Sequence, residues 1–364
     1  MMKALHKLAV VLIMILLLGG CQERSAAYNK IDRLINERFP ADGPGVAVFV
    51  AAPGLGRQQF AAGLSDVAEN KAMRSDDPFR IGALTQAFTS TLILQLIEQG
   101  TVALDDTLEK WLPVELLDTV PNSRSVTIRQ LLTMTSGIPD YQNHPGFQTA
   151  VAADPQRLWQ PEEILAFSAH QPPDFAPGER FGYSAANYVL LQMVAETVTG
   201  ESLAFNFRER FFYRLNMDSS YLEREEALPE GHVPGYTTAN GTAEIVSGKR
   251  DGLGLGSDGI VAPVSDLRRF APALATRQLT GNNADETYRT TEIGEGLGYG
   301  LGIMKQETPW GNLWGYSGAS AGTAGVMWYM SDPEVTLVLL SNDQEAQARL
   351  EQLALDIMAI VLEK

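Results

Sequence analysis

Cysteine is almost absent from this sequence of 364 residues, which has only Cys21. A single cysteine excludes an intrachain disulfide and a zinc site built from cysteines. Basic residues are also scarce, because 28 Lys and Arg face 44 Asp and Glu, and the net charge is −16. A surface this acidic repels phosphate backbones, which argues against nucleic acid as a main partner.

Long apolar runs are scarce as well, and the run from Leu8 to Leu18 has eleven residues. At about 1.5 Å per residue it reaches only about half of a ~30 Å hydrocarbon core, so it is too short for a membrane-spanning helix. Two lysines precede it and Gly19-Gly20-Cys21 follows, which is the layout of a secretory signal.

This layout resembles the bacterial lipoprotein signal, in which the cysteine is lipidated and becomes the first residue of the mature chain. The resemblance implies a signal peptide over residues 1–20, a lipid anchor at Cys21 and a short tether over residues 21–28. Loss of residues 1–20 changes the net charge to −18. Gln22 follows the cysteine, and by the same resemblance it favours the outer membrane, on its periplasmic face.

Hydrophobic periodicity divides the rest of the chain into three parts. The first part has a helix from residue 29 that ends at Pro40, followed by a β-hairpin. The middle part begins with an amphipathic helix over residues 81–99 and stays mainly helical to about residue 274. In the last part the period returns to two, with strands over residues 310–316, 324–329 and 336–341, before a C-terminal helix.

This order predicts an α+β fold, an α/β sandwich whose antiparallel sheet is built from both chain ends, with an inserted helical domain. We place the sheet-containing domain at residues 29–80 and 290–364 and the helical domain at residues 81–289. A cleft is expected where the two domains meet.

Four sequence blocks resemble, in order, the framework of the class C β-lactamase and penicillin-binding serine hydrolase family. The resemblance covers about residues 41–342 and implies a β-lactamase/transpeptidase-like fold. The blocks are Asp77–Gly82, Leu131–Gly137, Pro177–Ser184 and Gly298–Gly302.

The side chains that carry the family's chemistry are missing. In the family, a serine at the start of a helix attacks a carbonyl, and a lysine three residues later helps to take its proton. Those positions are Ala83 and Gln86 here. A methyl group cannot attack a carbonyl and a neutral amide is no base near pH 7, so the acyl-enzyme route is removed.

Two further motifs are changed. The family's Tyr-x-Asn motif reads Tyr183-Ser184-Ala185, so the asparagine is lost. The strand motif, which begins with lysine or histidine in the family, begins with Tyr316 here. The resemblance places six residues in the ligand cleft, which are Ala83, Tyr183, Ser184, Ser317, Gly318 and Ala319. No cofactor or metal motif accompanies them.

The leading hypothesis is a lipid-anchored pseudoenzyme whose former active site binds a peptide, a cell-wall fragment or an envelope protein without turnover. The backbone N–H groups of Ala83 and Ala319 need no particular side chain to hold a carbonyl or carboxylate. One alternative is a hydrolase that uses Ser184 or Ser317 as a relocated nucleophile. Another is a structural envelope lipoprotein with a vestigial cleft.

Replacement of Cys21 tests the lipoprotein interpretation. Cys21→Ser should give unlipidated or unprocessed protein, because the thiol is the only lipidation site at the end of the signal. Labelling with a radioactive fatty acid measures this directly. Label that persists in the Cys21→Ser variant would contradict the assignment.

Overall fold

A computed structural model describes residues 26–154, 157, 159–223, 225–227, 231–247, 255–281 and 284–363. The expected signal peptide, Cys21 and most of the tether lie outside these residues. Residues 26–28, which were expected in the tether, form the start of a helix over residues 26–38. Within the described ranges no helix is both long and apolar enough to cross a membrane.

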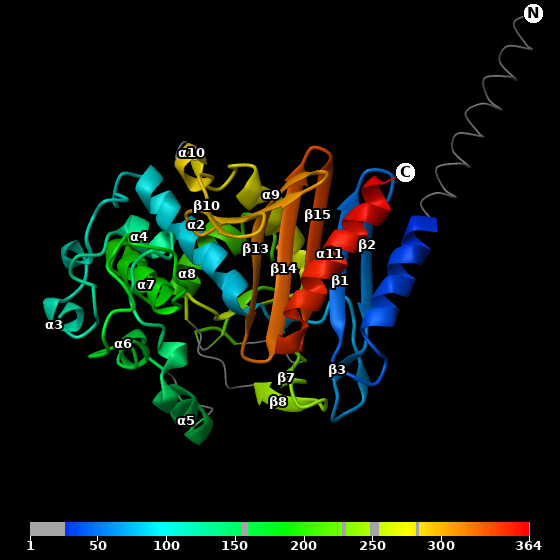
Figure 1. Cartoon of the computed structure of the whole chain (residues 1–364), viewed down its shortest axis with the longest axis horizontal. Helices are drawn as coiled ribbons and strands as arrows, with labels where there is room; N and C mark the ends of the chain where they lie inside the picture. Colours follow the sequence, from blue (N-terminus) through cyan, green and yellow to red (C-terminus); the bar gives the residue numbers. More distant parts are fainter. Residues whose placement is uncertain are drawn as a thin grey trace, which may run out of the picture.

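An eight-stranded antiparallel sheet forms the centre of the molecule (Figure 1). Its strand order is β10-β11-β12-β13-β14-β15-β1-β2, so the N-terminal hairpin pairs directly with the last strand of the chain. The strands are β1 (Val46–Ala52), β2 (Gly56–Ala62), β10 (Thr291–Gly294), β11 (Leu297–Tyr299), β12 (Met304–Thr308), β13 (Gly311–Ser320), β14 (Thr323–Ser331) and β15 (Glu334–Ser341).

Helices cover both faces of this sheet. Helix α11 (Gln347–Leu362) packs against β13, β14 and β15, and α9 (Val264–Ala275) packs against β14, β15 and β1. Helix 26–38 lies beside α11, where Arg38 forms an ion pair with Asp356 (Figure 1). Because both faces are covered, β1, β14 and β15 are apolar along almost their whole length rather than alternating.

The expected fold class is therefore confirmed, since the sheet comes from both chain ends and a mainly helical region is inserted between them. The division of residues between the two parts differs in one respect. Helix α9 falls inside the range assigned to the helical domain, yet it packs on the sheet.

The helical region lies beside the β13 side of the sheet (Figure 1). Its helices and single turns are η1 (Gly82–Leu84), α2 (Thr85–Glu98), η2 (Leu108–Lys110), α3 (Val114–Leu117), α4 (Ile128–Leu132), η3 (Tyr141–Asn143), α5 (Pro145–Ala153), α6 (Pro161–Leu165), α7 (Ala186–Thr199), α8 (Leu203–Phe207), the π-turn η4 (Arg208–Phe212) and α10 (Ala284–Thr287). A further turn, η6 (Gln344–Ala346), precedes α11.

The periodicity correctly places a helix at α2 but wrongly describes it as amphipathic. Residues Thr85–Leu94 and Leu96 are all buried, because α2 packs against α7 and α8 while η1, just before it, packs on β13 and β14. A helix that is surrounded by protein has no face in contact with solvent, so its sequence need not place polar residues on one side.

Short strands in the middle of the chain were not expected. They are β3 (Leu64–Asp66), β4 (Lys71–Ala72), β5 (Phe79–Arg80), β6 (Tyr221–Leu222), β7 (Gly235–Thr237), β8 (Glu244–Ser247) and β9 (Ile260–Ala262). They form separate small sheets, β3-β4, β5-β9-β6 and β7-β8. Strands of two to four residues are too short for an alternating pattern to reveal them.

A phenylalanine cluster joins α2 to the neighbouring helices. The ring of Phe88 stacks on Phe270 of α9 with centroids 3.6 Å apart, and it meets Phe211 and Phe212 of η4 edge-on. All four side chains are buried. The cluster therefore connects α2 to α9 and so to the central sheet.

We expect Phe88→Ala to lower the free energy of unfolding by about 3–5 kcal/mol, because it leaves a cavity between α2 and α9. Chemical denaturation of both proteins measures the change. Phe205→Ala is the matched control, since Phe205 is 50% exposed and its loss should have little effect. Equal destabilisation by the two substitutions would contradict this description of the core.

Candidate functional site

The chain reaches Ala83 through a glycine that allows η1 to lie against the end of β13. Gly82 has φ of +53°, and a Cβ at this position would lie 2.5 Å from the Cβ of Ser320. Only glycine combines this backbone conformation with so close an approach. Ala83 follows it at 5% exposure, and the side chain of Gln86 is fully buried one turn later.

Gln86 connects the two walls of the site through its amide. Its Nε2 donates a hydrogen bond to the Tyr183 hydroxyl at 2.8 Å, and its Oε1 accepts one from the Tyr316 hydroxyl at 2.6 Å. Tyr183 lies in the loop before α7, and Tyr316 lies on β13. Three positions from three separate sequence motifs are thus in direct contact.

The hydrogen bonds continue beyond Tyr316 to two more tyrosines. The Tyr316 and Tyr299 hydroxyls are 3.0 Å apart, and so are those of Tyr299 and Tyr188. Because Tyr316 donates to Gln86, it accepts from Tyr299, which in turn accepts from Tyr188. We call this series of Tyr188, Tyr299, Tyr316, Gln86 and Tyr183 the tyrosine–glutamine chain. Each group in this series donates to the next one, from Tyr188 towards Tyr183, and this common direction strengthens each hydrogen bond.

Every group in the tyrosine–glutamine chain is neutral near pH 7. Burial raises the pKa of the Tyr188, Tyr299 and Tyr316 hydroxyls above the ordinary value for tyrosine. Tyr183 is 42% exposed as a residue, but its hydroxyl lies against buried Gln86, and burial raises its pKa as well. The chain therefore supplies neither a cation nor a base to activate a nucleophile.

The structure places the other candidate residues unequally. Gly318 faces Ala83, because a Cβ at Gly318 would lie 3.0 Å from the Ala83 Cβ. Ser317 is on the opposite face of β13, where its hydroxyl donates to Glu351 of α11 at 2.7 Å. The expectation that Ser317 lines the cleft does not hold, since successive side chains of a strand point to opposite faces.

Ser184 and Ala185 are buried at the start of α7. The Ser184 hydroxyl has no hydrogen-bond partner among the described residues, so no neighbouring base there activates it. The hydroxyl of Thr85 accepts a hydrogen bond from the backbone N–H of Ile260 and has a structural role. None of these hydroxyls takes the place of the missing serine.

One edge of β13 is unpaired beside the site. The β12–β13 pairing ends at Met304 and Gly315, whereas β13 continues to Ser320 and pairs there with β14. Among the described strands, none pairs with the other edge of residues 316–320. This edge includes Gly318 and Ala319 and is available to an extended ligand.

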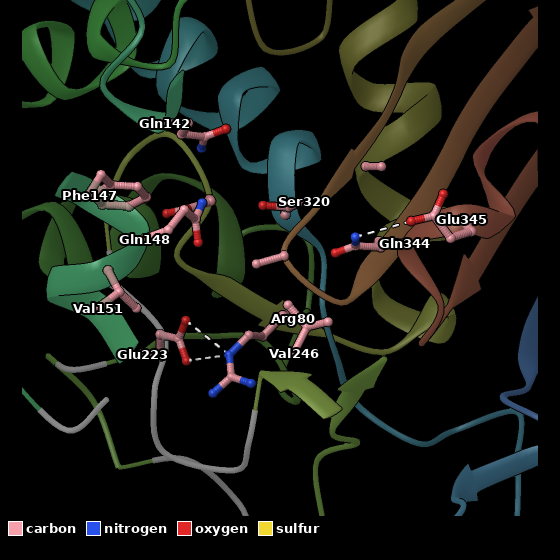
Figure 2. A pocket seen from close by; sticks show the side chains of 14 residues that line it. Arg80, Gln142, Phe147, Gln148, Val151, Glu223, Val246, Ser320, Gln344 and Glu345 are labelled. Atoms are coloured by element: carbon pink, nitrogen blue, oxygen red, sulfur yellow. Dashed lines mark hydrogen bonds and ion pairs between the residues drawn. The ribbon is translucent and has the colours of Figure 1, made fainter. Parts of the chain in front are cut away.

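A pocket of about 530 Å³ opens next to Ala83 (Figure 2). Figure 2 shows Phe147, Gln148 and Val151 of α5 on one side and Ser320, at the end of β13, on the other. The remaining lining residues are Arg80, Gly82, Gln142, Glu223, Val246, Asp258, Ala319, Ala321, Gln344 and Glu345.

Sequence reasoning missed the charged groups of this pocket. Arg80 and Glu223 form an ion pair at 2.9 Å, and their side chains are 6% and 3% exposed. Arg80 is in one of the framework blocks, three residues before Ala83. Its place in the sequence could therefore have predicted that it lies near the cleft. Glu223 and Asp258 carry no motif, and only the folded chain brings them here.

Two carboxyl groups near the pocket hold their protons more tightly than usual. Burial and, to a lesser extent, the charge of Glu223 raise the pKa of Asp258 to about 7, against the opposing effects of a hydrogen bond from Ser257 and the charge of Arg80. Burial also raises the pKa of Asp140 to about 6, although its carboxylate accepts hydrogen bonds from the backbone of Gln142 and Ala185. No group of three or more metal-ligating side chains is assembled within the described ranges.

The family model described as Beta-lactamase matches residues 31–360, so the chain belongs to this family of serine hydrolases. The family resemblance of the four sequence blocks is thereby confirmed.

Among curated relatives, penicillin-binding protein 4* of Bacillus subtilis is 27% identical over 304 residues, which cover 78% of this chain and 64% of that protein. A D-aminopeptidase of Brucella anthropi is 27% identical over 309 residues, which cover 82% of this chain and 56% of the D-aminopeptidase. The chain thus spans less than two thirds of the length of these relatives.

Solved structures show the same fold. A D-stereospecific amidohydrolase from Streptomyces sp. superposes with a TM-score of 0.79 at 28% identity, covering 91% of this chain and 98% of that one. D-amino acid amidase from Ochrobactrum anthropi SV3 has a TM-score of 0.76 at 21% identity, with 87% and 92% covered.

The tyrosine–glutamine chain predicts unequal effects of two similar substitutions. Tyr316→Phe should lower the free energy of unfolding by about 1–3 kcal/mol, because it leaves the buried Gln86 carbonyl without a donor. Tyr183→Phe should lower it by less than about 1 kcal/mol, since water can reach the partly exposed Tyr183 position and replace the lost acceptor. Urea denaturation of the two variants makes the comparison, and a larger effect for Tyr183→Phe would contradict the bonding described.

Proposed function

We propose that this protein binds ligands in the former active site without hydrolysing them. The observation that carries the proposal is the Gln86 amide, which bonds to both Tyr183 and Tyr316 where the family resemblance implies a catalytic lysine. A neutral side chain whose donor and acceptor are both engaged cannot take a proton from a nucleophile. Ala83 supplies no nucleophile in any case.

Binding survives the loss of these side chains because it depends on backbone and shape. The pocket beside Ala83 is of the size that accommodates small ligands. The unpaired edge of β13 offers backbone hydrogen bonds to an extended peptide. The backbone N–H groups of Ala83 and Ala319 are the pair that would hold a ligand carbonyl or carboxylate.

Peptides that contain D-residues, such as the stem peptides of peptidoglycan, are the ligand class we propose. The names of the relatives support this choice, since they include a D-aminopeptidase, a D-stereospecific amidohydrolase and a penicillin-binding protein. A lipid anchor at Cys21 on the periplasmic face of the outer membrane would place the cleft next to the cell wall. An envelope protein that presents an extended segment is the alternative partner.

The hydrolase alternative with a relocated nucleophile lacks support in the site. Ser317 bonds to Glu351 and Gln347 on the α11 side of β13, so this hydroxyl and its carboxylate partner face away from Ala83 and the pocket. The Ser184 hydroxyl has no partner in the described part of the chain, whereas a serine nucleophile needs a base within hydrogen-bond reach. The structural-lipoprotein alternative leaves the pocket without a role.

A reactive penicillin tests the absence of acyl transfer. The wild-type protein should form no covalent adduct, as measured by intact-protein mass spectrometry. A stoichiometric adduct at any residue would overturn the proposal.

The matched positive control restores the two missing groups. In Ala83→Ser/Gln86→Lys the new amine lies one helical turn from the new hydroxyl, and general-base assistance is typically worth about 10² to 10⁴ in rate. The double variant should therefore acylate far faster than either single variant and deacylate slowly, because Ala185 and Tyr316 stay unchanged. A folded double variant that forms no adduct would show that Ala83 and Gln86 are not the catalytic positions.

A further inference from the structure

The substitutions change the charge of the cleft as well as its reactivity. By the family resemblance, Gln86 and Tyr316 stand where lysine and lysine or histidine are usual, so basic side chains are missing at two positions of the cleft. Acidic groups remain around the cleft, since Glu223, Asp258 and Glu345 line the pocket and the charge of Asp140 acts on Tyr183. Among the described residues that line the pocket, Arg80 is the one basic side chain.

Arg80 is already occupied by Glu223. Its Nε donates to both carboxylate oxygens of Glu223, at 3.2 and 2.9 Å, and both side chains are almost fully buried (Figure 2). The two charges therefore largely cancel each other. Asp258 lies on the same pocket wall, where the repulsion from Glu223 outweighs the attraction of Arg80, and its contact with the Ser257 hydroxyl is long, at 3.4 Å.

Asp258 lies close enough to the tyrosine–glutamine chain to influence it. The negative charges of Asp140 and Asp258 both raise the pKa of Tyr183, whose hydroxyl is bonded to Gln86. The pocket that Asp258 lines also includes Gly82 and Ala319, which are the sequence neighbours of Ala83 and Gly318. The pocket therefore extends from Asp258 to the backbone next to Ala83.

We infer that the cleft selects ligands bearing a primary ammonium group, which Asp258 binds while the ligand carbonyl lies at the backbone N–H groups of Ala83 and Ala319. This inference rests on the proposed function and names the ligand class of the same site. An ammonium group supplies the positive charge that the substitutions removed, and it satisfies a carboxylate that is otherwise costly to bury.

The rest of the pocket fits the aliphatic part of such a ligand. Phe147, Val151 and Val246 line it together with the amides of Gln142, Gln148 and Gln344. Apolar and amide side chains contact methylene and peptide groups and add no charge. A ligand with two carboxylates and no amine would instead be repelled by the acidic side chains that line the pocket, Glu223, Asp258 and Glu345.

Acetylation of the ligand amine tests the inference, with the full-length protein held in detergent micelles. Calorimetric titration compares the binding of D-alanyl-D-alanine with that of its N-acetyl derivative, and this pair reports on a terminal amine. A second pair, Nα-acetyl-L-lysyl-D-alanyl-D-alanine and its Nα,Nε-diacetyl derivative, reports on a side-chain amine. In at least one pair acetylation should weaken binding tenfold or more, as expected for a charge-assisted hydrogen bond in a buried site.

The Asp258→Asn variant completes the test. It keeps the shape of the side chain and removes its charge, so the preference for the free amine should fall to less than about twofold. Asp154→Asn is the matched control, because Asp154 is an exposed carboxylate at the end of α5 that does not line the pocket, and it should keep the preference.

Each outcome has a distinct meaning. A preference for the free amine that is lost in Asp258→Asn and kept in Asp154→Asn supports the inference, and the responding pair identifies the amine. Equal binding of free and acetylated peptides overturns the inference and leaves the proposed function standing. If none of the four peptides binds the folded protein, both the proposed function and the inference fail.

Discussion

The Gln86 side chain joins the two walls of the cleft, and the character of the site depends on that contact. Its amide spans from Tyr183, in the loop before α7, to Tyr316 on β13. A lysine in the same buried place would need a compensating charge, whereas a primary amide needs one donor and one acceptor. The two tyrosine hydroxyls supply these, so the cleft keeps its width without any charge at its centre.

The same contact joins two of the motif positions that differ from the family pattern. Tyr316 also belongs to a hydrogen-bonded series that ends at Tyr299 and Tyr188. Gly302 permits this arrangement, since a Cβ there would lie 2.9 Å from the Tyr188 hydroxyl. The framework around the site thus serves a stable neutral network, and the acidic groups of the pocket become its dominant charges.

Sequence reasoning predicted the fold and the positions of Ala83, Gln86 and Tyr316, because ordered framework blocks specify where the motifs lie. It did not predict that Gln86 and Tyr316 would bond, since 230 residues separate them and only tertiary structure brings them together. The orientation of Ser317 could have been predicted from the alternation of side chains along a strand, because Ser317 must point away from the cleft if Tyr316 points into it. Asp258 and Glu223 were beyond prediction, because no local pattern marks a carboxylate that is buried by distant segments.

Binding without turnover is the central claim, and the fate of a bound ligand tests it most directly. D-alanyl-D-alaninamide carries both a free amine and an amide bond of the kind that D-amino acid amidases are named for. After a day with excess protein under equilibrium dialysis, the ligand should be enriched on the protein side and recovered chemically intact by mass spectrometry. Release of D-alanine or ammonia above the spontaneous rate, abolished by heat denaturation of the protein, would contradict the account.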